Sequence, residues 1–118
     1  VAEVRDSLEK AVARWARGLE QGDMYAYLDA YDDSFRHWGM NKDEWSAFSM
    51  ETVGHRPISR VEVSDLLLLG DPVEPGLYLS RFRLKIEEKE ARSVISVRRI
   101  YWRRSESGAF RIVAEDSG

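Results

Sequence analysis

The sequence predicts a single α+β domain, with three helices followed by about four antiparallel strands. Apolar residues recur at three- and four-residue spacing up to about residue 52, and from about residue 58 they alternate with polar residues. The later segments are joined by short turns, which force antiparallel pairing. The length of 118 residues, 43% of them hydrophobic, suits one domain with one core.

The first two helices are expected to form a hairpin with a wide aromatic stripe. The first helix is expected over residues 4–21, and Gly22 supplies a residue that tolerates the left-handed geometry of a helix end. Asp23 can cap a second helix over residues 23–31. The two stripes, spaced by three or four residues, consist of Val4, Leu8, Ala11, Val12, Trp15 and Leu19, then Met24, Tyr27, Leu28, Tyr31 and Phe35.

The third helix has the clearest local signature. Asn41 is a good N-cap, and Glu44 follows three residues later, as in a capping box. Gly54 is a plausible end, and Pro57 prevents continuation. A helix is therefore expected from Lys42 to about residue 53.

Four strands are expected after this helix, separated by turns at residues 70–76, 87–90 and 105–108. The last strand is expected over residues 110–113. In the first strand Val61, Val63, Leu67 and Leu69 share one parity, and Asp65 has the same parity. Asp65 therefore either faces inward with them, or faces outward as an ordinary strand charge opposite an arginine.

Composition excludes several classes of function. The formal net charge of −3 gives no overall attraction to nucleic acid or to an anionic membrane. There is no cysteine and there are only two histidines, so neither a disulfide nor a metal site is expected. No stretch is long and apolar enough for a membrane span, and no phosphate-binding loop or nucleophile motif is present, so no cofactor is expected. Since the chain begins with Val1, we expect either a domain excised from a longer protein or a processed protein.

The pattern resembles the nuclear transport factor 2-like superfamily. The resemblance covers nearly the whole chain and rests on the helix with Trp15, the Gly22-Asp23 junction, the aromatic stripe and the capped helix with Trp45. The closing stretch, Arg99 to Arg104 and then Gly108 to Glu115, strengthens it. Within the superfamily the chain is most similar to the C-terminal domain of bacterial L,D-transpeptidase-like cell-wall proteins.

The resemblance implies a cone-shaped, cystatin-like roll, in which a curved sheet wraps the first helix and leaves a pocket at its open end. Superfamily members include isomerases, dehydratases and cyclases as well as non-catalytic binding and dimerisation domains, so the fold does not fix the function. By resemblance alone, the host protein is expected in the bacterial periplasm or cell envelope.

Two residues are weak candidates for catalysis. An inward Asp65 would have a raised pKa, and His37 lies near Asp32 and Asp33 in sequence. For both, the non-catalytic interpretation is favoured: a loop histidine beside helix-terminal acids, and an exposed strand charge. Trp38 also stands out, because an aromatic residue in that loop can cover the mouth of a cone or a partner surface.

The candidate ligand pocket combines aromatic and basic residues. Arginines on the strands, interleaved with tyrosine and tryptophan, suit a carboxylate-bearing ligand or a glycan, although cross-strand ion pairing on a solvated face is favoured. For Trp15 a core position is favoured over a pocket position. The candidate pocket residues are Trp15, Tyr31, Phe35, Trp45, Phe48, Arg81, Arg83 and Tyr101.

These observations favour a non-catalytic accessory domain. We expect it to bind a small ligand or a cell-wall fragment, or to pair with a second copy through its sheet, and so to position an attached or partner cell-wall enzyme. The first alternative is a small enzyme of the cyclase, isomerase or dehydratase type that uses Asp65 or His37. The second is a purely structural dimerisation module. An inward, buried Asp65 or His37 beside a tyrosine hydroxyl favours the enzyme. A cone plugged by Trp15, Trp45 and Phe48 favours the structural module, and an open cone with arginines at its rim favours ligand binding.

Overall fold

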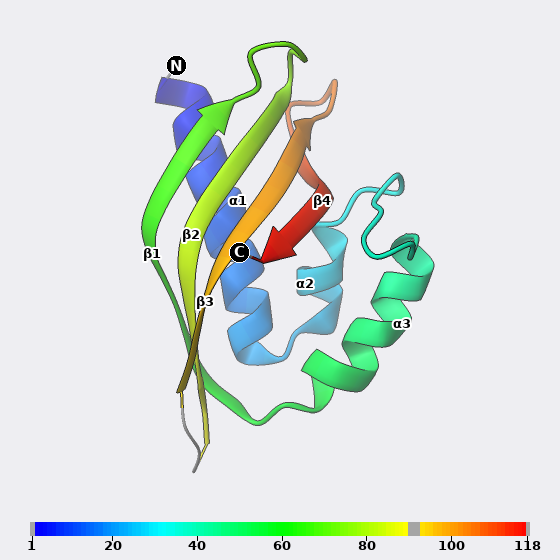
Figure 1. Ribbon diagram of the computed structural model, residues 1–118, viewed down its shortest axis with the longest axis vertical. Helices are drawn as coiled ribbons and strands as arrows, with labels where there is room; N and C mark the ends of the chain where they lie inside the picture. The colour runs from blue at the N-terminus through cyan, green and yellow to red at the C-terminus, as the bar shows by residue number, and fades with distance from the viewer. Residues whose placement is uncertain (1, 90–92, 118) are drawn as a thin grey trace.

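The computed structural model describes residues 2–89 and 93–117 and confirms the predicted α+β fold (Figure 1). Three helices come first: α1 (Ala2–Gln21), α2 (Met24–Asp29) and α3 (Lys42–Thr52), the last continued by a 3₁₀ turn, Val53–His55. Four strands follow: β1 (Ile58–Gly70), β2 (Leu77–Glu88), β3 (Ser93–Arg104) and β4 (Phe110–Ser117). The strands form one antiparallel sheet in the order β1-β2-β3-β4.

The helix ends follow the local sequence closely. Gly22 has φ 68° after α1, and the backbone N–H groups of Gly22 and Asp23 donate to the carbonyls of Leu19 and Gly18, which is a Schellman motif. The carboxylate of Asp23 then accepts from Ala26 N–H and caps α2.

The capping box of α3 is complete, because Asn41 and Glu44 each accept a hydrogen bond from the other's backbone N–H. By contrast, α2 ends two residues before the expected end. Tyr31 leaves the helix to form an isolated parallel bridge with Ile112 of β4.

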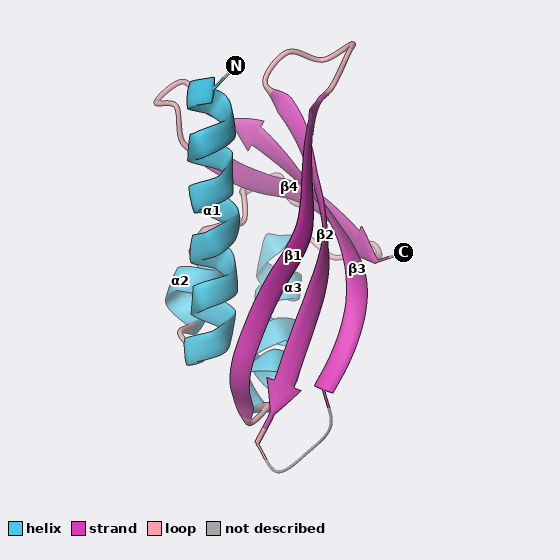
Figure 2. Cartoon of the chain, turned by 90° about the vertical axis from the view of Figure 1, so that its left-hand side faces the viewer, coloured by secondary structure: helices cyan, strands magenta, loops and turns pink. Residues whose placement is uncertain are grey.

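The sheet is long, twisted and curved, and α1 lies along its inner face (Figures 1 and 2). Figure 2 shows α2 and α3 gathered at one end of that face, while the outer face carries no helix among the described residues. The strand β4 joins the helical layer through backbone hydrogen bonds: Ile112 N–H donates to Ala30 O, and Asp32 N–H donates to Ile112 O, both at 2.7 Å.

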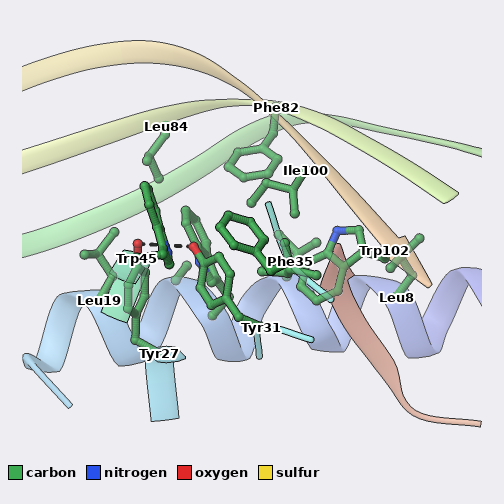
Figure 3. Packing of buried hydrophobic residues seen from close by; sticks show 14 of the residues in the cluster. Leu8, Leu19, Tyr27, Tyr31, Phe35, Trp45, Phe82, Leu84, Ile100 and Trp102 are labelled. Carbon is green, nitrogen blue, oxygen red and sulfur yellow. Dashed lines mark hydrogen bonds between the residues drawn. The ribbon is translucent and has the colours of Figure 1, made fainter. Parts of the chain in front are cut away.

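The core between the helices and the inner face of the sheet consists of aromatic and aliphatic side chains (Figure 3). Trp15, Tyr31 and Phe35 are fully buried against Phe82 and Trp102 of the sheet. Trp102 Nε1 donates to Ser80 Oγ at 2.9 Å, and this hydroxyl donates in turn to Ile100 O at 3.2 Å. The indole N–H therefore has a partner inside the core.

One strand differs from the simple two-residue alternation. Between the pairs Ser64–Arg83 and Leu67–Arg81, β1 contains one more residue than β2, which is a β-bulge at Asp65. The extra residue reverses the side of the sheet to which later side chains point. Leu66 and Leu68 pack on the core, whereas Leu67 and Leu69 are exposed. The expectation that Leu67 and Leu69 face inward with Val61 is therefore wrong.

Two further boundaries differ from expectation. The last strand continues to Ser117 instead of ending at residue 113. Glu87 and Glu88 of the expected charged turn belong to β2, and residue 90 lies outside the described residues.

Candidate functional site

A cleft of about 180 Å³ opens between α3, the middle of β3 and the C-terminal end of β4. Aromatic side chains of α3 and of the preceding loop line one side, among them Trp38, Trp45 and Phe48. Arg98 of β3 and Glu115 of β4 line the other side. We call this hollow the α3 cleft.

Glu115 is the central polar group of the α3 cleft. Its side chain is almost fully buried, and each carboxylate oxygen has a partner: the Tyr31 hydroxyl donates to Oε1 at 2.6 Å and Arg98 Nη1 donates to Oε2 at 3.1 Å. Burial raises the pKa of the Glu115 carboxyl, and the hydrogen bond from Tyr31 and the charge of Arg98 only partly offset this. The Glu115 side chain is therefore held in place by two hydrogen bonds, while its burial makes the ionised form costly.

A second bulge turns Glu115 toward the core. Tyr101 pairs with Ala114 and Trp102 pairs with Ile112, so Val113 is an additional residue in β4. The additional residue changes the phase of the strand, and Glu115 lies opposite Ile100, which is fully buried. Without this insertion, Ala114 would share the inward side with Ile112.

A chain of buried polar groups extends from Glu115 into the core. The Tyr31 hydroxyl has a single proton, which it donates in the short hydrogen bond to Glu115. The same oxygen accepts from Trp15 Nε1 at 3.2 Å and lies 3.3 Å from the Tyr27 hydroxyl, a contact drawn in Figure 3. Burial raises the pKa of both phenols above the ordinary value, so both stay protonated at neutral pH.

Three buried polar atoms of the α3 cleft residues have no hydrogen-bond partner within the described part of the chain. They are Trp45 Nε1, Ser49 Oγ and Arg98 Nε. Two are obligate donors and the hydroxyl can donate or accept. Buried polar groups are almost always paired, so three unpaired atoms on residues that line one hollow are unusual.

The loop before α3 ends in a tight turn at the edge of the cleft. His37 and Met40 exchange backbone hydrogen bonds of 3.1 and 2.8 Å, and Trp38 and Gly39 between them have φ values of 51° and 75°. The His37 ring packs edge-on against Trp45, with ring centroids 5.1 Å apart. The charge of His37 also lowers the pKa of Glu115 slightly, although burial dominates that carboxyl.

No family model matches the sequence, and no curated protein matches it. Solved structures do match. An NTF2-like protein of unknown function from Pseudomonas putida KT2440 superposes with a TM-score of 0.81 at 15% identity, over 100% of this chain and 87% of that one. The helical cell-shape-determining protein Pgp2 from Campylobacter jejuni gives 0.83 at 18% identity, over 96% of this chain and 40% of that one.

Bd1075 from Bdellovibrio bacteriovorus gives a TM-score of 0.79 at 21% identity, over 97% of this chain and 40% of that one. The chain has the NTF2-like fold. This NTF2-like domain spans less than half the length of the Pgp2 and Bd1075 chains, so in both of those proteins the matching region is one part of a larger molecule.

The eight residues expected to line one pocket of this NTF2-like domain lie in four places. Trp15, Tyr31 and Phe35 are in the core, where Tyr31 reaches the α3 cleft only through its hydroxyl. Trp45 and Phe48 line the cleft itself. Arg81, Arg83 and Tyr101 belong to hollows lined by other residues, away from the α3 cleft.

The two candidate acid–base residues are separated as well. Asp65 lies on the outer face of the sheet at the β1 bulge, with φ 54° and a side chain 72% exposed, 4.0 Å from Arg83. This is the outward alternative, an exposed strand charge beside an arginine. His37 lines the α3 cleft.

Sequence reasoning missed Glu115 and Ser49 and did not place Arg98 in the pocket. No sequence signal marked Glu115, because the last strand was expected to end at residue 113, before this residue. Among the described residues, no group of three or more histidine, aspartate or glutamate side chains is placed to hold a metal ion. No described helix is long and apolar enough to cross a membrane.

Proposed function

We propose that this NTF2-like domain is a non-catalytic ligand-binding module of a bacterial cell-envelope protein. Its α3 cleft takes a small molecule or a cell-wall fragment and so positions an attached or partner enzyme. The observation that carries the proposal is the set of three unpartnered buried polar atoms, Trp45 Nε1, Ser49 Oγ and Arg98 Nε, beside one cleft. A ligand with acceptor oxygens would satisfy all three.

The surroundings of Glu115 favour binding over catalysis. A general base needs a free lone pair directed at the substrate. Each oxygen of Glu115 already accepts one hydrogen bond, from Tyr31 or from Arg98, and the side chain is only 5% exposed, so little of the carboxylate is accessible to a substrate. Its role is therefore to hold the Arg98 guanidinium, which leaves Arg98 Nε for the ligand.

The cell-envelope setting is supported by the similarity to Pgp2, which is described as a helical cell-shape-determining protein. In that protein the matching region is 40% of the chain. An accessory domain beside a larger part of the molecule is consistent with a module that positions a substrate for a neighbouring enzyme.

The test is a titration of the domain with soluble peptidoglycan fragments, in which isothermal titration calorimetry measures the binding affinity. Ser49→Ala removes an unpartnered hydroxyl, and Arg98→Lys keeps the positive charge beside Glu115 while removing the Nε–H donor. We expect each change to weaken binding about tenfold, the equivalent of one hydrogen bond in a closed site. Arg83→Lys, on the outer face, is the matched control and should leave binding unchanged. Binding that is insensitive to both cleft variants would refute the assignment.

An enzymatic role is the second candidate, because a buried carboxyl with a raised pKa beside a tyrosine hydroxyl is typical of acid–base sites. Glu115→Gln separates the two functions. For a binding module the variant still binds and the wild type leaves bound fragments chemically intact, as mass spectrometry would show. Conversion of a fragment by the wild type, abolished in Glu115→Gln, would replace our proposal with the enzyme.

Pairing through the sheet is the third hypothesis, favoured by three exposed apolar side chains on the outer face, Leu67, Leu69 and Ile95. Sedimentation velocity distinguishes it. A dimer that dissociates on Leu67→Lys, in a domain that binds no fragment, would support a structural module.

A further inference from the structure

Trp38 occupies a backbone position that suits it poorly. It is the first central residue of a two-residue turn in which both central residues have positive φ, 51° and 75°. Such type I′ turns strongly prefer Asn, Asp and Gly, because a bulky side chain is strained at positive φ. Strained residues of this kind cluster at binding and catalytic sites.

Packing does not account for the strain, because the Trp38 side chain is 76% exposed. Its ring lies on the His37 ring, with centroids 4.3 Å apart and planes inclined by 32°. His37 in turn packs edge-on against Trp45. One face of the Trp38 ring therefore packs on His37, and the turn holds its backbone. The other face is a flat apolar surface at the edge of the α3 cleft.

We propose that Trp38 is the stacking platform of the α3 cleft and that the ligand is a neutral sugar ring. The inference rests on the proposed function and narrows it to the glycan part of a cell-wall fragment. One face of a pyranose ring consists of C–H groups and stacks on an indole, while its edge carries oxygens that both accept and donate hydrogen bonds. The cleft residues match both parts of such a sugar. The Trp38 indole suits the C–H face, and the unpartnered donors of Trp45 and Arg98 and the Ser49 hydroxyl suit the oxygens.

Charge and size argue against a nucleotide, another ligand that stacks on indoles. Arg98 pairs with Glu115 at 3.1 Å and Asp116 pairs with Arg99 at 2.8 Å, so the site offers no unpaired arginine to a phosphate or a nucleotide. A volume of about 180 Å³ lies below the range of about 300–1,000 Å³ that is usual for drug-sized ligands. It suits one ring with its substituents.

The test uses tryptophan fluorescence, because Trp38 is highly exposed whereas Trp15, Trp45 and Trp102 are at least 93% buried. The long-wavelength emission therefore belongs to Trp38. The probes are the β-1,4-linked trimer of N-acetylglucosamine and, separately, a cell-wall stem peptide without sugar. We expect the trimer to shift this emission to shorter wavelength and the peptide to leave it unchanged.

Variants complete the test. Trp38→Asn suits the turn and removes the platform, so trimer affinity should fall at least tenfold, while Trp38→Phe should lose only a few-fold. Tyr25→Ala removes another highly exposed aromatic, one outside the cleft, and should change nothing.

Trimer affinity that stays within twofold in Trp38→Asn would overturn the inference. Peptide binding that depends on Ser49 and Arg98 would also overturn it, while leaving the proposed function intact. If neither probe binds the wild type, both proposals fail.

Discussion

Removing the Tyr31 hydroxyl tests the polar network at the base of the cleft. Tyr31→Phe keeps the shape of a fully buried ring and deletes a single oxygen. Glu115 then loses a charge-assisted hydrogen bond of 2.6 Å, a loss worth about 1.5–3 kcal/mol, and the buried Trp15 N–H loses its partner, which costs about 1–3 kcal/mol. We expect the free energy of unfolding to fall by about 3–5 kcal/mol, a large share of the total of about 5–15 kcal/mol usual for one domain.

The assay is urea unfolding followed by circular dichroism, with Tyr27→Phe as the matched control. Within the described residues the Tyr27 hydroxyl has one hydrogen-bond partner, the Tyr31 hydroxyl at 3.3 Å, so its loss should cost about 1 kcal/mol or less. The cost of Tyr31→Phe should also shrink in acid, because a protonated Glu115 no longer needs a partner for its charge. Equal costs for the two variants, or a pH-independent cost for Tyr31→Phe, would refute this account.

Three further changes test other features of the domain. Because folding raises the pKa of Glu115 above 4.5, its protonated form stabilises the domain fully below that pH, and this stabilisation is lost as pH rises through the folded-state pKa. Glu115→Gln should abolish the loss. The unfolding midpoints of the two proteins should therefore converge in acid and diverge toward neutral pH. Gly18→Ala places a Cβ 2.9 Å from the backbone nitrogen of Tyr27 and should cost about 1–3 kcal/mol by thermal unfolding, whereas an unchanged midpoint would mean that α2 shifts freely on α1. Trp38→Asn relieves a strained turn and should raise stability by about 0.5–1 kcal/mol by calorimetry, whereas a loss above about 1 kcal/mol would show that Trp38 supports the fold.

Most of the fold could be predicted from local sequence signals. The Asn41–Glu44 capping box, the Gly22-Asp23 junction and the change from helical to alternating periodicity each act within a few residues, so a single sequence contains all the information needed. The burial of Trp15 followed in the same way from its place on the stripe of the first helix.

The candidate site was harder to predict, because two single-residue insertions decide which acid faces the core. The bulge in β1 puts Asp65 on the outer face, and the bulge in β4 turns Glu115 inward. Alternation counted along one strand cannot reveal an insertion, since a bulge is defined by the partner strand. The unpartnered Ser49 hydroxyl was equally hidden, because its burial depends on how α3 docks.

The Tyr31–Glu115 hydrogen bond has a consequence for the order in which the domain folds. The two residues are 84 positions apart, whereas the sheet is a succession of neighbouring hairpins. Hairpins close short loops and form early, while contacts between distant segments carry a larger entropic cost and come late. We therefore expect the α3 cleft to form late in folding, when β4 docks beside Tyr31. A ligand bound between α3 and Arg98 would slow the undocking of β4 during unfolding. Occupancy of the cleft would therefore lengthen the lifetime of the whole native domain.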